Sequence, residues 1–440
     1  MRHFLSALLL LAAALGATSR PTDAQALANA GRGPVRLDGR ALADNGGPWL
    51  PLGASLFWAL WGERHDPDRL DRNLAWLADR GVDYVRVLGM VGTESWSDRQ
   101  ISPRAPGYWD TVDRLFARLA RHGLRVQVTI FADAQVMMPR RADRQAFVDA
   151  WAARAEAHRA RLVLLEVANE YRQNGLEDVA ELRSLGRRLA RRTRVLVALS
   201  AASTSNACQV YRGSAADVAT VHYPRDSSEG DPWQPVRRPW GWPGAYDAAC
   251  RGGLPVAVNN EPIGPQSSVK ADDDPLRLVM AYVTTFVAGN AAYVLHAGAG
   301  IRGGGAADLA AGRSADFADV PNLTTVLAGL QRAKAYLPRD LANWRRHDAR
   351  DPAHPFIGFD EAVRSGTLGA AYAATSHNRF VVAVLGARGD LVVRARTPLV
   401  VEIHEPLGDR AARRVDLGAG ERLTLSGADA FVMTGSSLDR

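Results

Sequence analysis

Short apolar runs alternate with segments of helical periodicity through the first three quarters of the chain. The runs span residues 52–57, 84–88, 125–131, 162–168, 195–200, 218–222, 255–259 and 292–296. Between them, apolar residues recur at helical spacing in segments such as 69–80, 108–122, 143–158, 177–192, 276–288 and 323–336. Strands buried on both faces read as continuous apolar runs, and parallel neighbours need crossover helices. Eight such units over about 290 residues predict an α/β fold, a (β/α)8 TIM barrel.

A doubly wound open sheet is the competing architecture. It normally carries a glycine-rich phosphate-binding turn after the first strand, and residues 53–57, Gly-Ala-Ser-Leu-Phe, do not form one. An opening hairpin is expected to join 35–37 to 49–52 through a turn at 45–48. The glycine-rich stretch 298–305 is expected to form a flexible loop after the last barrel strand.

The pattern changes after Tyr336. Short β-rich runs separated by turn residues occupy 380–385, 391–395, 399–403, 414–417, 422–425 and 430–434. They predict a small antiparallel β-sandwich appended to the barrel. Because this part shows no obvious aromatic platform, we expect a structural buttress rather than an independent binding module.

The first residues have the form of a secretory signal. A basic start precedes the apolar run 4–17, and Ala24 and Ala26 mark a small-x-small cleavage site. The run is too short to span a membrane, and no later stretch reaches ~20 apolar residues. We therefore expect a secreted or periplasmic protein without membrane attachment after cleavage. Its segments are a signal peptide at 1–26, the barrel with its hairpin at 27–337 and the sandwich at 338–440.

Composition adds three points. The 440-residue chain has a formal net charge of +7, but only Lys270 and Lys334 are lysines and the arginines are interleaved with acids. A generally basic surface is therefore favoured over a nucleic-acid partner. The 11 tryptophans, as many as the phenylalanines, suit flat, ring-shaped ligands. Cys208 and Cys250 either form one disulfide, as an oxidising compartment allows, or remain two separate buried thiols.

Candidate chemistry follows from the positions at which the runs end. In a TIM barrel, reactive side chains lie at the carboxyl ends of the strands and on the loops that follow. Glu170 follows the fourth run and Glu261 the seventh. These strands lie nearly opposite one another in a ring of eight, so the two side chains can converge over the barrel mouth. Other polar side chains at the strand ends are Arg86, Asp133, Asn169, His222, Tyr223 and His296.

Two facing carboxylates are what cleavage of a glycosidic bond with retained configuration needs. One attacks the anomeric carbon, while the other protonates the leaving oxygen and later activates water, at a separation of roughly 5–5.5 Å. A cationic donor keeps the attacking carboxylate ionised, and Arg86 is the candidate. Glu166, two pleat repeats before Glu170, is interpreted as a buried structural acid paired with an arginine.

The strand-end residues resemble those of the clan A retaining glycoside hydrolases, most nearly the cellulase-like family 5. The resemblance covers residues 33–337, including the hairpin. It implies that Glu261 is the nucleophile and Glu170 the acid/base. It further implies that Asn169 hydrogen-bonds the sugar 2-hydroxyl, that Arg86 holds the nucleophile, and that His222 is the site histidine of the sixth strand.

Three further substrate-binding candidates depart from the family pattern. Tyr223 directly follows His222, whereas the family has His-x-Tyr. Since neighbouring strand residues face opposite ways, Tyr223 reaches Glu261 only if the strand has already ended. His296 stands near the point where the family has a tryptophan floor, and Asp133 replaces the family's histidine after strand three.

Tryptophans are the candidates for stacking on sugar rings. Trp58 follows strand one, and Trp233, Trp240 and Trp242 crowd the long loop 224–244 on the same rim as the glutamates. The alternative is that they fill the loop as core residues.

The sequence thus predicts a glycosidase that cleaves β-glycosidic bonds of an oligo- or polysaccharide by double displacement, without cofactor or metal. A non-catalytic carbohydrate-binding barrel is the first alternative. A metal-assisted hydrolase using His222, His296 and Asp133 is the second, although the first strand lacks an early His-x-His. The oligomeric state is not predicted.

Overall fold

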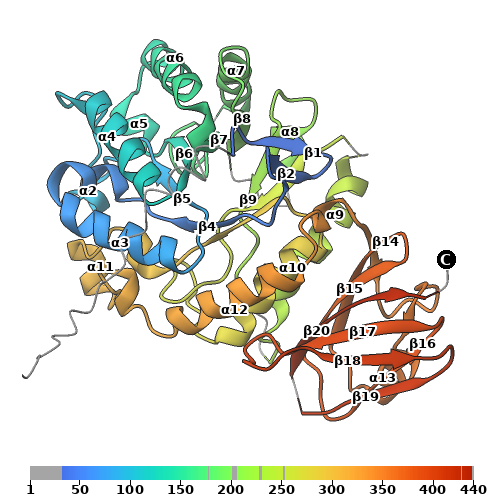
Figure 1. The fold of residues 1–440 in the computed structure, drawn as a ribbon. Coiled ribbons are helices and arrows are strands. Elements are labelled where there is room, and N and C mark those ends of the chain that lie inside the picture. Colours follow the sequence, from blue (N-terminus) through green and yellow to red (C-terminus); the bar gives the residue numbers. More distant parts are fainter. Residues whose placement is uncertain are drawn as a thin grey trace, which may run out of the picture.

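The computed structural model describes residues 32–176, 178–200, 206–226, 230–250, 253–427 and 429–438, without the side chains of 95 and 242–249. Its larger part is an eight-stranded parallel sheet in the order β8-β7-β6-β5-β4-β11-β10-β9, surrounded by helices (Figure 1). The predicted barrel is therefore confirmed. Its strands are β4 (Leu52–Ser55), β5 (Tyr84–Leu88), β6 (Arg125–Phe131), β7 (Leu162–Ala168), β8 (Leu196–Ser200), β9 (Val218–Val221), β10 (Val256–Asn259) and β11 (Ala292–Leu295).

The strands form where the apolar runs predict them. Every residue of β5, β6 and β7 is buried, which is why each reads as an uninterrupted run. The remaining barrel strands differ from their predicted bounds by no more than two residues at an end. Tyr211 ties β8 to β9: its hydroxyl donates to the Ser200 carbonyl and accepts from the amide of Thr220. Strands β8 and β9 stand at the two ends of the strand order, so these hydrogen bonds link the first strand of the sheet to the last.

Helices connect successive strands and begin at recognisable caps. Asp66 caps α3 by accepting from the amide of Arg69, and Asp274 caps α10 by accepting from that of Leu276; a proline follows each cap. The helices of this part are α2 (Ala59–His65), α3 (Pro67–Asp79), α4 (Tyr108–Arg121), α5 (Ala134–Met137), α6 (Arg141–Ala157), α7 (Val179–Ala190), α8 (Ala207–Tyr211), α9 (Gln234–Cys250), α10 (Pro275–Val287), α11 (Ala306–Ala310) and α12 (Leu323–Tyr336). Short 3-10 turns are η1 (Glu94–Trp96), η2 (Arg159–Arg161), η3 (Gly298–Gly300), η4 (Phe317–Asp319) and η5 (Leu341–Asn343).

A small antiparallel sheet covers the amino ends of the barrel strands. It consists of β1 (Arg36–Asp38), β2 (Ala41–Asp44) and β3 (Gly47–Pro48). Leu42 and Trp49 pack in one cluster with barrel residues, and Asp44 forms a buried ion pair with Arg125 at the start of β6. The predicted pairing of 35–37 with 49–52 is wrong, because Gly39 adopts a φ of +62° and turns β1 directly into β2.

The C-terminal part is the predicted antiparallel β-sandwich. One sheet has six strands in the order β12-β14-β15-β20-β17-β18, and the other has three in the order β13-β16-β19. Three of the nine strands, β12, β13 and β14, were not predicted. The elements are β12 (Arg345–Asp348), β13 (Ile357–Gly358), α13 (Asp360–Ser365), β14 (Ala370–Ser376), β15 (Arg379–Leu385), β16 (Leu391–Ala395), β17 (Leu399–His404), β18 (Arg413–Leu417), β19 (Arg422–Leu425) and β20 (Ala430–Ser437).

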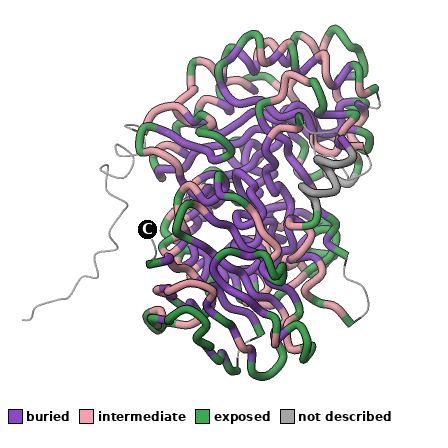
Figure 2. The backbone as a smooth tube through the Cα atoms, turned by 90° about the vertical axis from the view of Figure 1, so that its right-hand side faces the viewer, coloured by how far each residue is buried: buried purple, intermediate pink, exposed green. Residues whose placement is uncertain are grey.

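The inner strands β14 and β15 of the six-stranded sheet are buried on both faces. In β14, Tyr372 and Ala374 join the barrel core, whereas Ala371 and Ala373 join the interior of the sandwich. This alternation follows from the two-residue period of a strand. Helices α10 and α12 lie between the barrel strands and the red C-terminal strands, and buried backbone continues from one part into the other (Figures 1 and 2). The sandwich is therefore packed against the barrel over a shared apolar core.

Two expectations about loops are wrong. The predicted loop 224–244 contains most of α9, whose Pro235 lies in the first turn, where a missing amide hydrogen costs nothing. The stretch 298–305 is not a free loop: Gly298, Ala299 and Gly300 are buried in η3, and the Gly300 carbonyl accepts from the amide of Phe57. A Cβ on Gly300 would lie 1.9 Å from the Ser55 carbonyl oxygen, so the glycine allows this close packing.

Cys208 and Cys250 form a disulfide that joins α8 to the end of α9. Of the two possibilities left open by the sequence, the paired one holds. The expected signal peptide at 1–26 lies outside the described residues. Within the described part of the chain, no helix combines the length and the apolar character needed to cross a bilayer.

Candidate active site

The carboxylate of Glu261 lies at the carboxyl end of the barrel against Arg86. Glu261 follows β10 by two residues, and its side chain is only 6% exposed. Arg86 comes from the middle of β5 and is fully buried; its Nη1 donates to Glu261 Oε1 at 2.7 Å. Its Nη2 donates to Asn169 Oδ1 at 2.7 Å, which orients the amide that follows β7. One guanidinium thus fixes two of the predicted site residues.

Glu166 lies below this pair inside the barrel. Its Oε2 is 3.1 Å from Arg86 Nη2 and accepts a hydrogen bond from the Thr129 hydroxyl at 2.5 Å. The side-chain amide of Asn260 donates to the same carboxylate. All of these groups are buried, so the carboxylate is compensated by one cation and by neutral donors. The interpretation of Glu166 as a buried acid paired with an arginine is confirmed.

Glu170 faces Glu261 from the loop after β7, with His222 between them. Nδ1 of His222 is 3.0 Å from Glu170 Oε1, and its Nε2 is 3.4 Å from Glu261 Oε1. Atoms of all three side chains lie within 4.8 Å of one another. Glu170 has a φ of +35°, a region that residues other than glycine rarely adopt and that often marks functional positions. Its side chain is 31% exposed, in contrast to the buried Glu261.

A second arginine approaches Glu261 from the other side. Arg225, in the segment after β9, places Nη2 at 3.5 Å from Glu261 Oε2 and donates from Nη1 to the Ser267 hydroxyl at 3.1 Å. Burial alone would raise the pKa of the Glu261 carboxyl, but interactions with the histidines and arginines around it hold the pKa well below its ordinary value. These side chains are His222, His296, Arg86 and Arg225.

His296 completes this end of the barrel. Its Nδ1 is 3.0 Å from the Ser55 hydroxyl and its Nε2 is 3.0 Å from that of Ser268. Burial lowers the pKa of His296 to about 4, so the ring is neutral at neutral pH and takes part as a hydrogen-bonding group. The permanent positive charges beside Glu261 are therefore those of the two arginines.

Solved structures with a similar fold are glycoside hydrolases. A glycoside hydrolase family 5 protein from Bacteroides vulgatus ATCC 8482 superposes with a TM-score of 0.67 at 13% identity, covering 93% of this chain and 95% of that one. A second glycoside hydrolase gives 0.63 at 14% identity, over 93% and 98% of the two chains. A GH30 endoxylanase from Clostridium papyrosolvens C71 gives 0.50 at 12% identity, over 89% and 97%.

This chain shares the fold of these solved structures. The similarity includes the sandwich as well as the barrel, because more than nine-tenths of this chain is covered in the first two comparisons. No protein-family model matches the sequence, and no curated protein matches it. What the barrel does must therefore be argued from the side chains at its mouth.

Two predicted substrate-binding residues do not point to this cluster. Asp133 has a φ of +58°, and its carboxylate accepts from the backbone amides of Gly92 and Thr93, so it joins two loops. Tyr223 is buried, and its hydroxyl donates to Asn290 Oδ1 at 2.6 Å. Strand β9 has already ended at Val221, so it is the hydrogen bond to Asn290 that turns Tyr223 away from the cluster.

The described tryptophans of the prediction are packed in the interior or against the sandwich. Trp58 is fully buried, and its Nε1 donates to the Ala299 carbonyl. Trp240 stacks on Tyr372 of β14 at 4.6 Å, and Trp233 packs beside Gly386 of the sandwich. The side chain of Trp242 lies outside the described residues.

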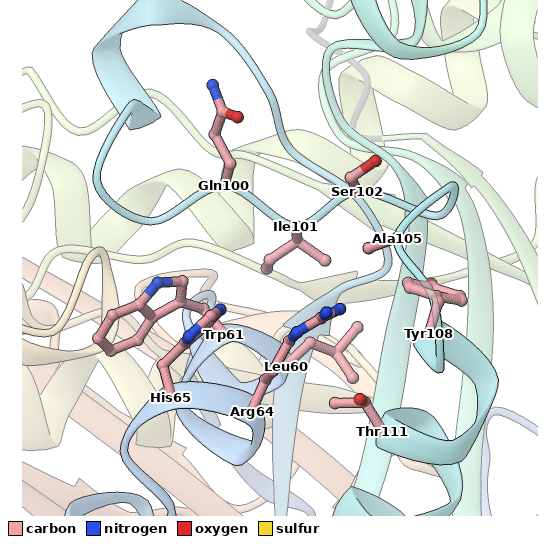
Figure 3. A pocket seen from close by; sticks show the side chains of 10 residues that line it. All are labelled: Leu60, Trp61, Arg64, His65, Gln100, Ile101, Ser102, Ala105, Tyr108 and Thr111. Atoms are coloured by element: carbon pink, nitrogen blue, oxygen red, sulfur yellow. The ribbon is translucent and has the colours of Figure 1, made fainter.

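A different tryptophan lines a cavity of about 240 Å³. Trp61 of α2 lines it, partly exposed, with the guanidinium of Arg99 3.9 Å from its ring centre. Figure 3 shows side chains of α2 on one side and those of 100–105 on the other. Both segments come after barrel strands in the chain: α2 follows β4, and 100–105 lies between β5 and α4. It is lined by Leu60, Trp61, Arg64, His65, Gln100, Ile101, Ser102, Ala105, Tyr108 and Thr111.

The cluster supports two kinds of chemistry. A buried, ionised carboxylate can attack a carbon atom, while the more exposed carboxylate that faces it transfers a proton to the oxygen leaving that carbon. The atoms of Glu170, His222 and Glu261 are also close enough together to ligate one metal ion. The sequence reasoning missed the contact between Arg225 and Glu261; the only available signal was the position of Arg225 shortly after the end of β9.

Proposed function

We propose that this protein is a retaining glycoside hydrolase that cleaves β-glycosidic bonds of an oligo- or polysaccharide. The observation that carries the proposal is the approach of the Glu170 and Glu261 carboxylates to within 4.8 Å of one another. Retaining enzymes need carboxyl groups about 5–5.5 Å apart, whereas inverting enzymes need about 6.5–9.5 Å to admit a water molecule. The glycosidase fold agrees with this assignment.

In the first step Glu261 attacks the anomeric carbon. A carboxylate oxygen forms a bond to that carbon while the bond to the leaving oxygen breaks and Glu170 transfers a proton to that oxygen. Arg86 holds Oε1 of Glu261, and the low pKa of the carboxyl leaves it ionised at neutral pH. The products of this step are a glycosyl ester on Glu261 and a released alcohol or sugar.

In the second step Glu170, now ionised, takes a proton from water. The water oxygen attacks the same carbon, and the ester bond to Glu261 breaks, restoring its carboxylate. His222 bonds to Glu170 and reaches toward Glu261, so it links the two carboxylates through both steps. Asn169 is held by Arg86 beside Glu261, where its amide can bond a sugar hydroxyl. The cavity beside Trp61 offers room for a further sugar unit of a chain.

The first test is turnover of chromogenic β-glycosides and labelled glycans. Wild type is expected to hydrolyse at least one of them, and Glu261→Gln to lose the activity by several orders of magnitude. Glu405→Gln, an exposed glutamate of the sandwich, is the matched control and should keep full activity. Binding of a glycan without turnover by wild type would favour the non-catalytic carbohydrate-binding barrel.

A metal-assisted hydrolase is the second candidate. It is favoured by the three possible ligand atoms on Glu170, His222 and Glu261. Overnight dialysis against a chelator distinguishes the two: unchanged turnover supports the double displacement, and loss that zinc restores supports the metal. Neither Asp133 nor His296 belongs to this three-residue group.

We also propose that the protein is exported. The basis is the sequence of 1–26 and the Cys208–Cys250 disulfide, since disulfides persist in oxidising compartments. N-terminal sequencing of protein secreted by a bacterial host should begin near Leu27. Retention of Met1 in the exported protein would contradict the cleavage.

A further inference from the structure

Two buried carboxylates compete for the charge of Arg86. Glu166 Oε2 lies 3.1 Å from one terminal nitrogen of Arg86, and Glu261 Oε1 lies 2.7 Å from the other. The three side chains are at most 6% exposed, so little solvent screens them. Two carboxylates and one guanidinium leave this buried group one negative charge in excess. An uncompensated buried charge is costly, and a second cation is needed close by.

Arg225 is placed to supply that charge. Its side chain is 7% exposed and approaches the oxygen of Glu261 that Arg86 does not bind. The Ser267 hydroxyl accepts from its other terminal nitrogen, which holds the guanidinium in place. Tyr223, two residues earlier, is bonded to Asn290 and does not reach Glu261. With Arg225 included, two carboxylates face two guanidiniums.

We propose that Arg225 is a positioning residue: it neutralises the second carboxylate oxygen of Glu261, because the charge of Arg86 is shared with Glu166. The inference rests on the proposed function for the role of Glu261 as nucleophile, but the electrostatic pairing stands on the geometry alone. In this proposal the charges of Arg86 in β5 and Arg225 after β9 balance those of two carboxylates. The carboxylates are Glu166 in β7 and Glu261 after β10.

Three other titratable side chains face Glu261 and are left unsubstituted in the experiment. His222 follows β9, Glu170 follows β7 and His296 follows β11. His296 is neutral above about pH 5 because of its low pKa. All three remain unchanged in the variants compared below, so differences among these variants report on the two arginines and their carboxylates.

The first arm of the test is the pH dependence of kcat/KM on an aryl glycoside. Removing a cation this close to a carboxylate raises its pKa by about 1–3 units. Arg225→Met is therefore expected to move the acidic limb of the profile to higher pH than in wild type. Arg225→Lys keeps the charge and should keep most of the wild-type profile. A uniform loss at all pH values in Arg225→Met would overturn the proposal.

The second arm is rescue by Glu166→Gln. The amide oxygen introduced by this substitution would still accept from Thr129, but the side chain would no longer share the charge of Arg86, which then serves Glu261 alone. The double variant Arg225→Met, Glu166→Gln should move the acidic limb back toward wild type by at least half of the shift. Failure of the second substitution to restore the limb in a folded double variant would show that charge sharing is not the reason for Arg225.

The third arm does not depend on activity. In wild type the pairing with Arg225 stabilises the folded state only while Glu261 is ionised. The Tm deficit of Arg225→Met should be largest above about pH 5 and shrink as the pH falls, because Glu261 then becomes protonated in the variant. In a Glu261→Gln background the same substitution should give a deficit that does not vary with pH. If no glycoside is turned over, the proposed function fails, but the Tm measurement still tests whether Arg225 pairs with Glu261. A Tm deficit of Arg225→Met that does not vary with pH while Glu261 is present would refute the pairing.

Discussion

A carboxylate oxygen of Glu170 and one of Glu261 lie within 4.8 Å of one another, although the residues follow different strands, β7 and β10. Their surroundings differ: Glu261 is buried against arginines, whereas Glu170 is 31% exposed and contacts His222. A buried ionised group suits nucleophilic attack, and a more accessible group suits exchange of protons with water. Both residues are glutamates, so it is their different surroundings that suit Glu261 to nucleophilic attack and Glu170 to proton transfer.

Removal of the acid/base should affect substrates unequally. Glu170→Ala is expected to slow hydrolysis of unactivated glycosides by about 10²–10⁴-fold, since protonation of the leaving oxygen is lost. Substrates with good leaving groups need little protonation and should form the glycosyl-enzyme at near wild-type rates. Added azide should then increase turnover and give a β-glycosyl azide, detected by chromatography. Equal loss on all substrates with no azide effect would assign Glu170 another role.

The cavity beside Trp61 should matter only for extended substrates. Trp61→Ala is expected to lower kcat/KM on a polysaccharide by about 3- to 10-fold through loss of aromatic contact, with no change on a small aryl glycoside. Trp61→Phe keeps a ring and serves as the control. A parallel loss on both substrates would show that the substitution disturbs the barrel rather than a binding position.

The disulfide should stabilise the segment between α8 and α9. Joining Cys208 to Cys250 closes a loop of 42 positions, for which chain entropy predicts about 3–4 kcal/mol. Reduction, or the double substitution of both cysteines by alanine, should lower the Tm measured by calorimetry. An unchanged Tm after reduction, with two titratable thiols appearing, would show that the bond adds no stability.

His354 of the sandwich should contribute to acid sensitivity. Its Nδ1 accepts from the amides of Phe356 and Ile357, and burial lowers its pKa to about 4. Because the pKa is near 6.5 when unfolded, the neutral buried ring stabilises the fold above that value, and the stability is lost as the pH falls toward 4. The contribution is about 3 kcal/mol.

His354→Asn removes the titrating group but keeps an acceptor. Its deficit relative to wild type, measured by urea unfolding, should narrow between about pH 7 and pH 4. His296 also titrates in this range, so some acid sensitivity is expected to remain in the variant. Parallel stability curves for the two proteins would contradict the account of His354.

The barrel could be predicted because its strands are covered on both faces. Each strand of this kind reads as an apolar run, and β5, β6 and β7 have the predicted bounds. Strand β14 (Ala370–Ser376) was missed because alanine has little preference for strands; burial against both the barrel and the sandwich decides its structure. The helix α9 was missed because its prolines and glycines suggested a loop.

The site was predictable only as far as strand ends define it. Arg86, Asn169, Glu170, His222 and Glu261 meet because the carboxyl ends of parallel strands lie at one edge of the barrel. The direction of Tyr223, the burial of Trp58 and the docking of Trp240 on the sandwich depend on tertiary contacts that no local pattern encodes. The same holds for the contact of Arg225 with Glu261.

Covalent labelling tests the central claim most directly. A 2-deoxy-2-fluoro glycoside of the preferred sugar, carrying a good leaving group, forms a glycosyl-enzyme quickly and hydrolyses it slowly. Mass spectrometry of proteolytic peptides should find one sugar per chain, attached to Glu261. Attachment to another residue, or turnover of an active wild type without any covalent adduct and with inverted product configuration, would contradict the double displacement.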